Sequence, residues 1–199
     1  SEKTINYLID LGKNVLFISN KTTGNIDDYS NFLNSFGIKV KSEQFINATL
    51  VISDYLKDNY KGFKFYTIGE KKFIQAIENI GLYYTEDPAK VQIVIITLDR
   101  NLNDKKIQIA EKSLKNGAKF LAANTDKTCP IEGKKEIVDA GITIEKLENL
   151  TNRKLEISFG KPTEHMINFI RQKFANNEKT VLLGDRLETD ILMGKKMGI

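Results

Sequence analysis

The sequence predicts an α/β protein in which helices cover a mostly parallel sheet. Short apolar runs alternate with helical patterns along all 199 residues, as in chains whose strands are joined by crossover helices. Three of these runs, which begin at Val15, Val91 and Thr180, are continuously apolar. Strands buried on both faces of a parallel sheet have this character.

Six strands are expected in chain order. They cover residues 15–19, 63–68, 91–98, 119–123, 155–159 and 180–183. The chain opens at Ser1-Glu2-Lys3 within a helical pattern, and two further helices are expected at residues 104–116 and 164–176. Gly117 suits the C-terminal end of the first of these two. Their apolar faces consist of Ile107, Ala110 and Leu114 in the first and Ile167, Ile170 and Phe174 in the second.

Composition excludes several classes of protein. A hydrophobic content of 41% suffices for a packed core, and no apolar run approaches the roughly 20 residues of a membrane helix. The net charge of +4 is slight and the charged residues are interspersed along the chain, so no nucleic-acid partner is expected. Cys129 is the only cysteine, which rules out an intrachain disulfide and suits a reducing, cytoplasmic location.

The most informative segment is Gly184-Asp185-Arg186-Leu187-Glu188-Thr189-Asp190, which follows the apolar run 181–183. A carboxylate held at a strand end suits a hard cation such as Mg²⁺, and Asp185 is the expected ligand. Asp190 is expected about one helical turn deeper, as a partner in the metal site. An acid-rich helix start is the alternative interpretation, since helix N-termini favour acids.

Two other strand ends carry phosphate-binding chemistry. Ser19 ends the first expected strand and Asn20 follows it, so a hydroxyl and a backbone amide can cradle an anion. Taken alone, the segment is better explained as a helix N-cap with an Asn-rich turn. Lys161 stands between Gly160 and Pro162 after another expected strand. Its ammonium can neutralise a phosphoryl group, although most lysines are simply solvated.

These three segments resemble the second, third and fourth motifs of the haloacid dehalogenase superfamily of phosphohydrolases. The closest resemblance is to the branch of 4-nitrophenylphosphatase-like, sugar-phosphatase-like and pyridoxal phosphate phosphatase-like enzymes. Asn124-Thr125-Asp126 with Pro130, and Asp139-Ala140-Gly141 leading to residues 151–154, match this branch as well. The resemblance therefore covers nearly the whole chain.

The resemblance implies a Rossmann-like three-layer core at residues 1–68 and 155–199, with an α/β cap domain inserted at 69–154. It implies a Mg²⁺-dependent phosphatase that acts on a small phosphorylated metabolite through an aspartyl-phosphate. The implied phosphoryl-binding residues are Ser19, Asn20 and Lys161, the implied metal site is Asp185 with Asp190, and Arg186 and Thr189 would steady the phosphate or the loop. Asn124 and Asp126 would contact the leaving group from the cap.

The sequence departs from the family pattern at two places. Lys21 replaces the second Asn of the usual Thr-Asn-Asn and adds a positive charge beside the phosphate. The first motif, Asp-x-Asp, which supplies the nucleophile and the general acid, does not occur in the 199 residues. We therefore expect a chain trimmed at both ends and inactive on its own.

Two rival functions stay open. One is a non-catalytic module that binds a phosphorylated metabolite or a protein; the other is an unrelated nucleotide-binding protein, against which the lack of a glycine-rich phosphate loop argues. Neither a membrane nor a nucleic acid is an expected partner, and a homodimer stays open. His165, the only histidine, is expected on the surface and is assigned no role.

Overall fold

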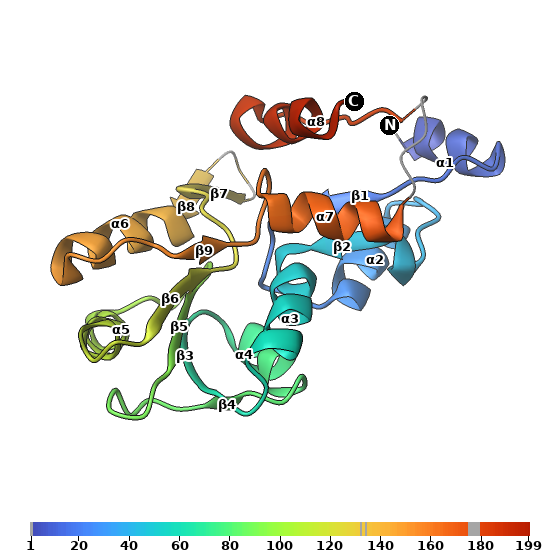
Figure 1. Ribbon diagram of the computed structural model, residues 1–199. Coiled ribbons are helices and arrows are strands. Elements are labelled where there is room, and N and C mark those ends of the chain that lie inside the picture. Colours follow the sequence, from blue (N-terminus) through green and yellow to red (C-terminus); the bar gives the residue numbers. More distant parts are fainter. Residues whose placement is uncertain (1, 132, 134, 175–179) are drawn as a thin grey trace.

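The computed structural model describes residues 2–131, 133, 135–174 and 180–199. Its helices and strands alternate along much of the chain (Figure 1). In chain order they are α1 Glu2–Asp10, β1 Phe17–Ser19, α2 Ile26–Ser35, the 3₁₀ turn η1 Ser42–Gln44, β2 Phe45–Asn47, α3 Ala48–Asn59, β3 Lys64–Ile68, α4 Lys71–Glu78, β4 Tyr83–Tyr84, β5 Ile93–Ile96, α5 Asp104–Lys115, β6 Lys119–Ala122, β7 Thr128–Ile131, β8 Lys135–Val138, α6 Ala140–Thr151, β9 Ile157–Ser158, α7 Glu164–Lys173, the π-helix η2 Leu187–Ile191 and α8 Leu192–Met197. The alternation is broken where β4 is followed directly by β5, and β6 by β7 and β8.

Three sheets organise these elements. The largest has five parallel strands in the order β4-β3-β5-β6-β9. β1 pairs in parallel with β2, and β7 forms an antiparallel hairpin with β8. The fold class is therefore α/β, as the sequence predicts.

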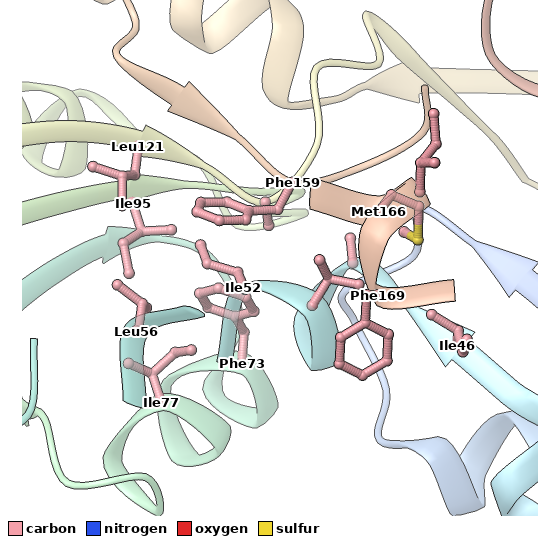
Figure 2. Packing of buried hydrophobic residues seen from close by; sticks show 14 of the residues in the cluster. Ile46, Ile52, Leu56, Phe73, Ile77, Ile95, Leu121, Phe159, Met166 and Phe169 are labelled. Atoms are coloured by element: carbon pink, nitrogen blue, oxygen red, sulfur yellow. The ribbon is translucent and has the colours of Figure 1, made fainter. Parts of the chain in front are cut away.

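Both faces of the five-stranded sheet are buried, and β5 shows why. Along this strand Ile93 and Ile95 join one hydrophobic cluster while Val94 and Ile96 join another, because successive side chains of a strand point to opposite faces. The first cluster continues through α3, α4 and α7 to β2, and Figure 2 shows Ile52, Phe159 and Ile46 among its side chains. The second lies beneath α5 and α6, which cover the opposite face (Figure 1).

Most predicted elements are confirmed, with shorter bounds. Strands form within the predicted ranges 15–19, 63–68, 91–98, 119–123 and 155–159, and the second predicted helix ends at Lys173; the residues predicted beyond Phe174 lie outside the described part of the chain. Gly117 follows α5 with a φ of +96°, the left-handed conformation expected of a helix-terminating glycine. The sequence did not predict β2, β4 or the β7–β8 hairpin.

One predicted strand is wrong. Residues 180–183 form no strand, and Val181 and Leu183 are 76% and 89% exposed. The segment therefore lacks the burial that its apolar character predicts, since a strand forms only where a neighbour pairs with its backbone. The prediction that β1 is buried on both faces is also wrong, because all three of its residues are only half-buried.

The division into core and cap stays a prediction. The predicted boundaries after residues 68 and 154 leave β3 and β9 on the core side, yet both strands pair with strands of the predicted cap. The five-stranded sheet thus continues across both boundaries. Among the described residues no helix is both long enough and apolar enough to cross a membrane.

Candidate active site

The loops that follow β1, β6 and β9 meet the 184–190 segment around a single cavity of about 200 Å³. Segments more than 100 residues apart in sequence come together there, although β1 belongs to the two-stranded sheet and β6 and β9 belong to the five-stranded one. All nine residues predicted for the site line this cavity: Ser19, Asn20, Asn124, Asp126, Lys161, Asp185, Arg186, Thr189 and Asp190.

Lys161 lies at the centre of the polar contacts. Its ammonium donates to Asp190 Oδ1 at 2.6 Å and to the carbonyl of Ile18 at 3.4 Å, and both side chains of the ion pair are nearly buried, with 13% and 10% exposed. An ammonium has three N–H donors, so one remains for a ligand oxygen. Thr163 caps α7 directly after this turn and fixes where the helix begins.

The Asn20 carboxamide holds Lys161 in place. Asn20 Oδ1 accepts a hydrogen bond from the Lys161 backbone N–H at 2.7 Å, and Nδ2 donates to Asp126 Oδ2 at 3.1 Å. Gly160 permits this approach, since a Cβ there would stand 2.8 Å from Asn20 Oδ1. The carboxamide is thus occupied by protein groups, which leaves the backbone amide as the part of Asn20 suited to a phosphoryl oxygen.

Ser19 keeps a free donor. Its Oγ accepts the Lys21 backbone N–H at 3.1 Å, and a hydroxyl that accepts one bond can still donate its own proton. The same bond fixes the loop that carries Lys21 over the end of β1. The Ser19 hydroxyl therefore has both the position and the proton to bind an anion in the cavity.

Asp190 is held more firmly than Asp185. Its carboxylate accepts from Lys161 and from the Arg186 backbone N–H at 3.3 Å, within the π-helix η2, a type of turn that is frequent at functional sites. Gly184 is required for this packing, because a Cβ at that position would lie 2.2 Å from Asp190 Cβ. Asp185 is exposed and lines the cavity; the expectation that a strand end holds it is wrong, since no strand precedes it.

These two acids limit which metal the site fits. Within the described ranges, no group of three or more His, Cys, Asp or Glu side chains is arranged to hold a metal ion. Mg²⁺ is usually bound by one or two carboxylates together with substrate phosphates and water. The donor set therefore fits Mg²⁺ bound jointly with a phosphate.

Asp126 links two other segments of the cavity wall, the loop after β1 and the 184–190 segment. Besides Asn20, its carboxylate faces the Arg186 guanidinium at 3.6 Å, and Arg186 also donates to the Thr128 carbonyl at 3.3 Å. Gly141 lets the loop pack on α6, since a Cβ there would meet the Thr125 carbonyl at 2.6 Å. Of the two roles predicted for Arg186, these contacts favour locking the loop.

Asn124 and Asp139 form a buried polar pair behind this wall. Asn124 Nδ2 donates to both Asp139 oxygens at 3.4 Å, and Asp139 Oδ1 accepts the Ala140 N–H at 2.6 Å as the N-cap of α6. Burial raises the pKa of Asp139 above that of an ordinary aspartate. Asn124 Oδ1 is buried without a hydrogen-bond partner among the described residues.

Sequence reasoning assigned no role to several other cavity residues. Asp139, Leu98, Thr128 and Cys129 all line it. The Asp139-Ala140-Gly141 segment could have indicated Asp139, because Asp before a helical pattern is an N-cap signal. Thr128 and Pro130 lie on β7.

Comparison with known proteins matches both ends of the chain to hydrolase families. Residues 1–83 match the family described as haloacid dehalogenase-like hydrolase, and residues 158–199 match a second family described as HAD-hydrolase-like. The cavity residues Ser19, Asn20, Lys161, Asp185 and Asp190 all lie within these matched ranges.

Similar proteins cover almost the whole chain. The chain is 27% identical to phosphoglycolate phosphatase 1A, chloroplastic, of Arabidopsis thaliana, with 98% of this chain and 60% of that protein aligned. It is 28% identical to ribonucleotide monophosphatase NagD of Escherichia coli over 96% of this chain and 74% of that protein. A crystal structure of a double mutant of thermostable NPPase from Geobacillus stearothermophilus superposes with a TM-score of 0.89 at 26% identity, covering 100% of this chain and 79% of that one. The chain thus spans about 60% of the plant protein and about three quarters of the other two.

Proposed function

Because the chain belongs to the haloacid dehalogenase-like hydrolases, we propose that its cavity is the phosphoryl site of a Mg²⁺-dependent phosphatase for small phosphate monoesters. The observation that carries the proposal is the position of Lys161. Its ammonium lies beside Ser19 and the 184–190 loop, with one N–H donor left for a ligand.

The proposed phosphoryl cradle consists of three donors. The Ser19 hydroxyl, the Asn20 backbone amide and the Lys161 ammonium would each bind a phosphoryl oxygen. The transition state of phosphoryl transfer spreads negative charge over these oxygens, so fixed donors stabilise it without reorganising. The Asn20 carboxamide and Asp190 contribute indirectly, since they hold Lys161.

Asp185 would hold Mg²⁺, with Asp190 beside it. Bound there, the ion would neutralise phosphoryl charge and align the ester. Asp190 accepts from Lys161 and from the Arg186 N–H, so its main contribution is to position the ammonium and the loop. Asp185 is left with its charge available.

The chemistry also needs a nucleophile. In this proposal an aspartate attacks phosphorus, the alcohol leaves, and water then hydrolyses the aspartyl-phosphate. The 199 residues contain no Asp-x-Asp pair, so the attacking carboxylate is proposed to come from polypeptide other than these residues. By themselves they would bind a phosphate without turning it over.

The leaving group would face Asn124 and Asp126. These residues belong to the predicted cap, which is proposed to close over the ester and exclude water. The names of similar proteins span phosphoglycolate, ribonucleotide and sugar phosphatases, all of which act on small phosphorylated molecules. A cavity of about 200 Å³ is smaller than the roughly 300–1,000 Å³ of drug-sized ligand sites and favours the smaller esters.

Hydrolysis of 4-nitrophenyl phosphate tests the proposal. We expect no turnover by the 199-residue chain with Mg²⁺, and Mg²⁺-dependent turnover by a polypeptide that also carries the Asp-x-Asp strand. A Lys161→Gln variant of the active polypeptide should lose most of its kcat/KM. Full turnover by the 199 residues alone would contradict the mechanism.

The second candidate is a non-catalytic module that binds a phosphorylated metabolite. It is favoured by the same missing acidic pair, because the cradle would then bind without reacting. If the natural reading frame encodes no Asp-x-Asp pair, this non-catalytic function is the correct one.

A further inference from the structure

Lys21 differs from the other cations of the cavity. Three basic side chains line it: Lys161 is paired with Asp190 at 2.6 Å, and Arg186 faces Asp126 at 3.6 Å. The Lys21 side chain forms no hydrogen bond or ion pair anywhere in the described part of the chain. Its charge is therefore available to a ligand.

The backbone fixes Lys21 next to the proposed cradle. Its N–H donates to Ser19 Oγ at 3.1 Å, so the residue starts one step beyond the phosphoryl-binding hydroxyl. The charge of the Lys21 side chain affects Cys129 of β7, which lines the same cavity. Burial raises the pKa of the Cys129 thiol, and the positive charges of Lys21 and Arg186 lower that pKa. Lys161, by contrast, lies against Ile18 and Asp190.

The carboxylates of the cavity do not neutralise Lys21. Asp126 and Asp190 are engaged by Arg186 and Lys161, and Asp139 is bonded to Asn124 and the Ala140 N–H. Asp185 remains, and it is the proposed Mg²⁺ ligand. A cation is thus left over on the side where the leaving group of an ester would lie.

We propose that Lys21 selects phosphate monoesters whose leaving group carries a carboxylate close to the ester oxygen. The proposal rests on the proposed function, because it takes the phosphoryl group to occupy the Ser19–Lys161 cradle. An ammonium attracts any anion, and the small cavity favours a carboxylate over a second phosphate. Lys21 is exposed, so the expected gain is about twofold to fivefold in affinity, as for a solvent-exposed ion pair.

A matched pair of ligands tests this inference on the 199-residue chain. Calorimetry with Mg²⁺ would compare phosphoglycolate with 2-hydroxyethyl phosphate, which has a hydroxyl in place of the carboxylate, and with inorganic phosphate. We expect phosphoglycolate to bind about twofold to fivefold more tightly than 2-hydroxyethyl phosphate. Lys21→Gln should remove this preference, while Lys21→Arg and the remote charge-matched control Lys13→Gln should keep it.

The outcomes separate the inference from the proposed function. If inorganic phosphate binds but the two esters bind equally, or if Lys21→Gln keeps the preference, Lys21 is not the selective residue. If Lys21→Gln weakens all three ligands by the same factor, the lysine binds the phosphoryl group and the inference is wrong. If inorganic phosphate does not bind at all, the proposed function fails and this inference fails with it.

Discussion

At the scale of single residues, the contacts of the site divide the predicted residues by task. Lys161 and Ser19 keep donors free for a ligand, whereas Asn20 and Asp190 use their side chains to hold Lys161. The sequence could predict which residues gather, because each follows a predicted strand, although no strand forms at residues 180–183 before Asp185. It could not predict this division, because the division depends on contacts between segments more than 100 residues apart.

The position of His165 differs from the one expected from the sequence. The sequence places it on the surface, yet its ring is half-buried and packs against Phe159 at 4.7 Å and Tyr55 at 5.1 Å between centroids. Burial lowers its pKa below the usual value. The aromatic partners lie on α3 and in the loop after β9, so no local sequence pattern predicted these contacts.

This environment predicts a pH dependence of stability. The unfolded chain, in which histidine has a pKa of about 6.5, binds the proton more readily than the folded chain. The stability contributed by neutral His165 is therefore present above about pH 6.5 and is lost as pH falls through the lowered folded pKa. NMR titration of the single imidazole should give a pKa below 6.5, and urea unfolding of the wild type should lose stability relative to His165→Phe over that window. A pKa at or above 6.5 would contradict the packing.

At the scale of elements, the apolar pattern predicted burial better for β5 than for residues 181–183. Both runs are continuously apolar, but β5 has parallel neighbours on both sides and 181–183 has no strand partner among the described residues. The apolar pattern of a segment indicates which side chains it can bury. Whether a neighbouring strand is present depends on the rest of the fold. The short β7–β8 hairpin was missed for the opposite reason, because its partly exposed residues carry no apolar run.

Unfolding measurements distinguish the two segments. Leu183→Ala should change the free energy of unfolding by less than about 0.5 kcal/mol, because an exposed side chain loses little packing. Leu121→Ala, at a fully buried position of β6, is the matched control and should cost about 2–5 kcal/mol. Equal losses would mean that residues 181–183 are buried as the sequence predicts.

At the scale of the whole molecule, the site lies where the β1–β2 pair and the five-stranded sheet meet. A single hydrophobic cluster joins Ile46 of β2 to Phe73 of α4 and to Ile95 of β5 in the larger sheet. Above it, polar contacts cross the same junction: the Thr22 and Thr97 hydroxyls are hydrogen-bonded, and Asp126 faces both Asn20 and Arg186. These contacts join the proposed cradle to residues of the predicted cap.

The α/β class and the membership of the site could be predicted from strand ends and motif order alone. The extent of the larger sheet could not, since β3 and β9 belong to it although the predicted boundaries exclude them. Their pairing with β5 and β6 depends on tertiary packing across both boundaries, and composition does not change there.

The central claim is that the cavity binds a phosphoryl group through Lys161 with Mg²⁺ at Asp185. Calorimetric titration of the 199-residue chain with inorganic phosphate, with and without Mg²⁺, tests it most directly. We expect Mg²⁺ to strengthen phosphate binding, Asp185→Asn to remove that effect, and Lys161→Gln to weaken binding about tenfold or more, as for a lost charged hydrogen bond. The exposed charges Lys13 and Asp58 lie outside the cavity lining, so Lys13→Gln and Asp58→Asn should behave as the wild type, with circular dichroism confirming that each variant is folded. Phosphate affinity that is unchanged in folded Lys161→Gln, or independent of Mg²⁺ in the wild type, would contradict the account.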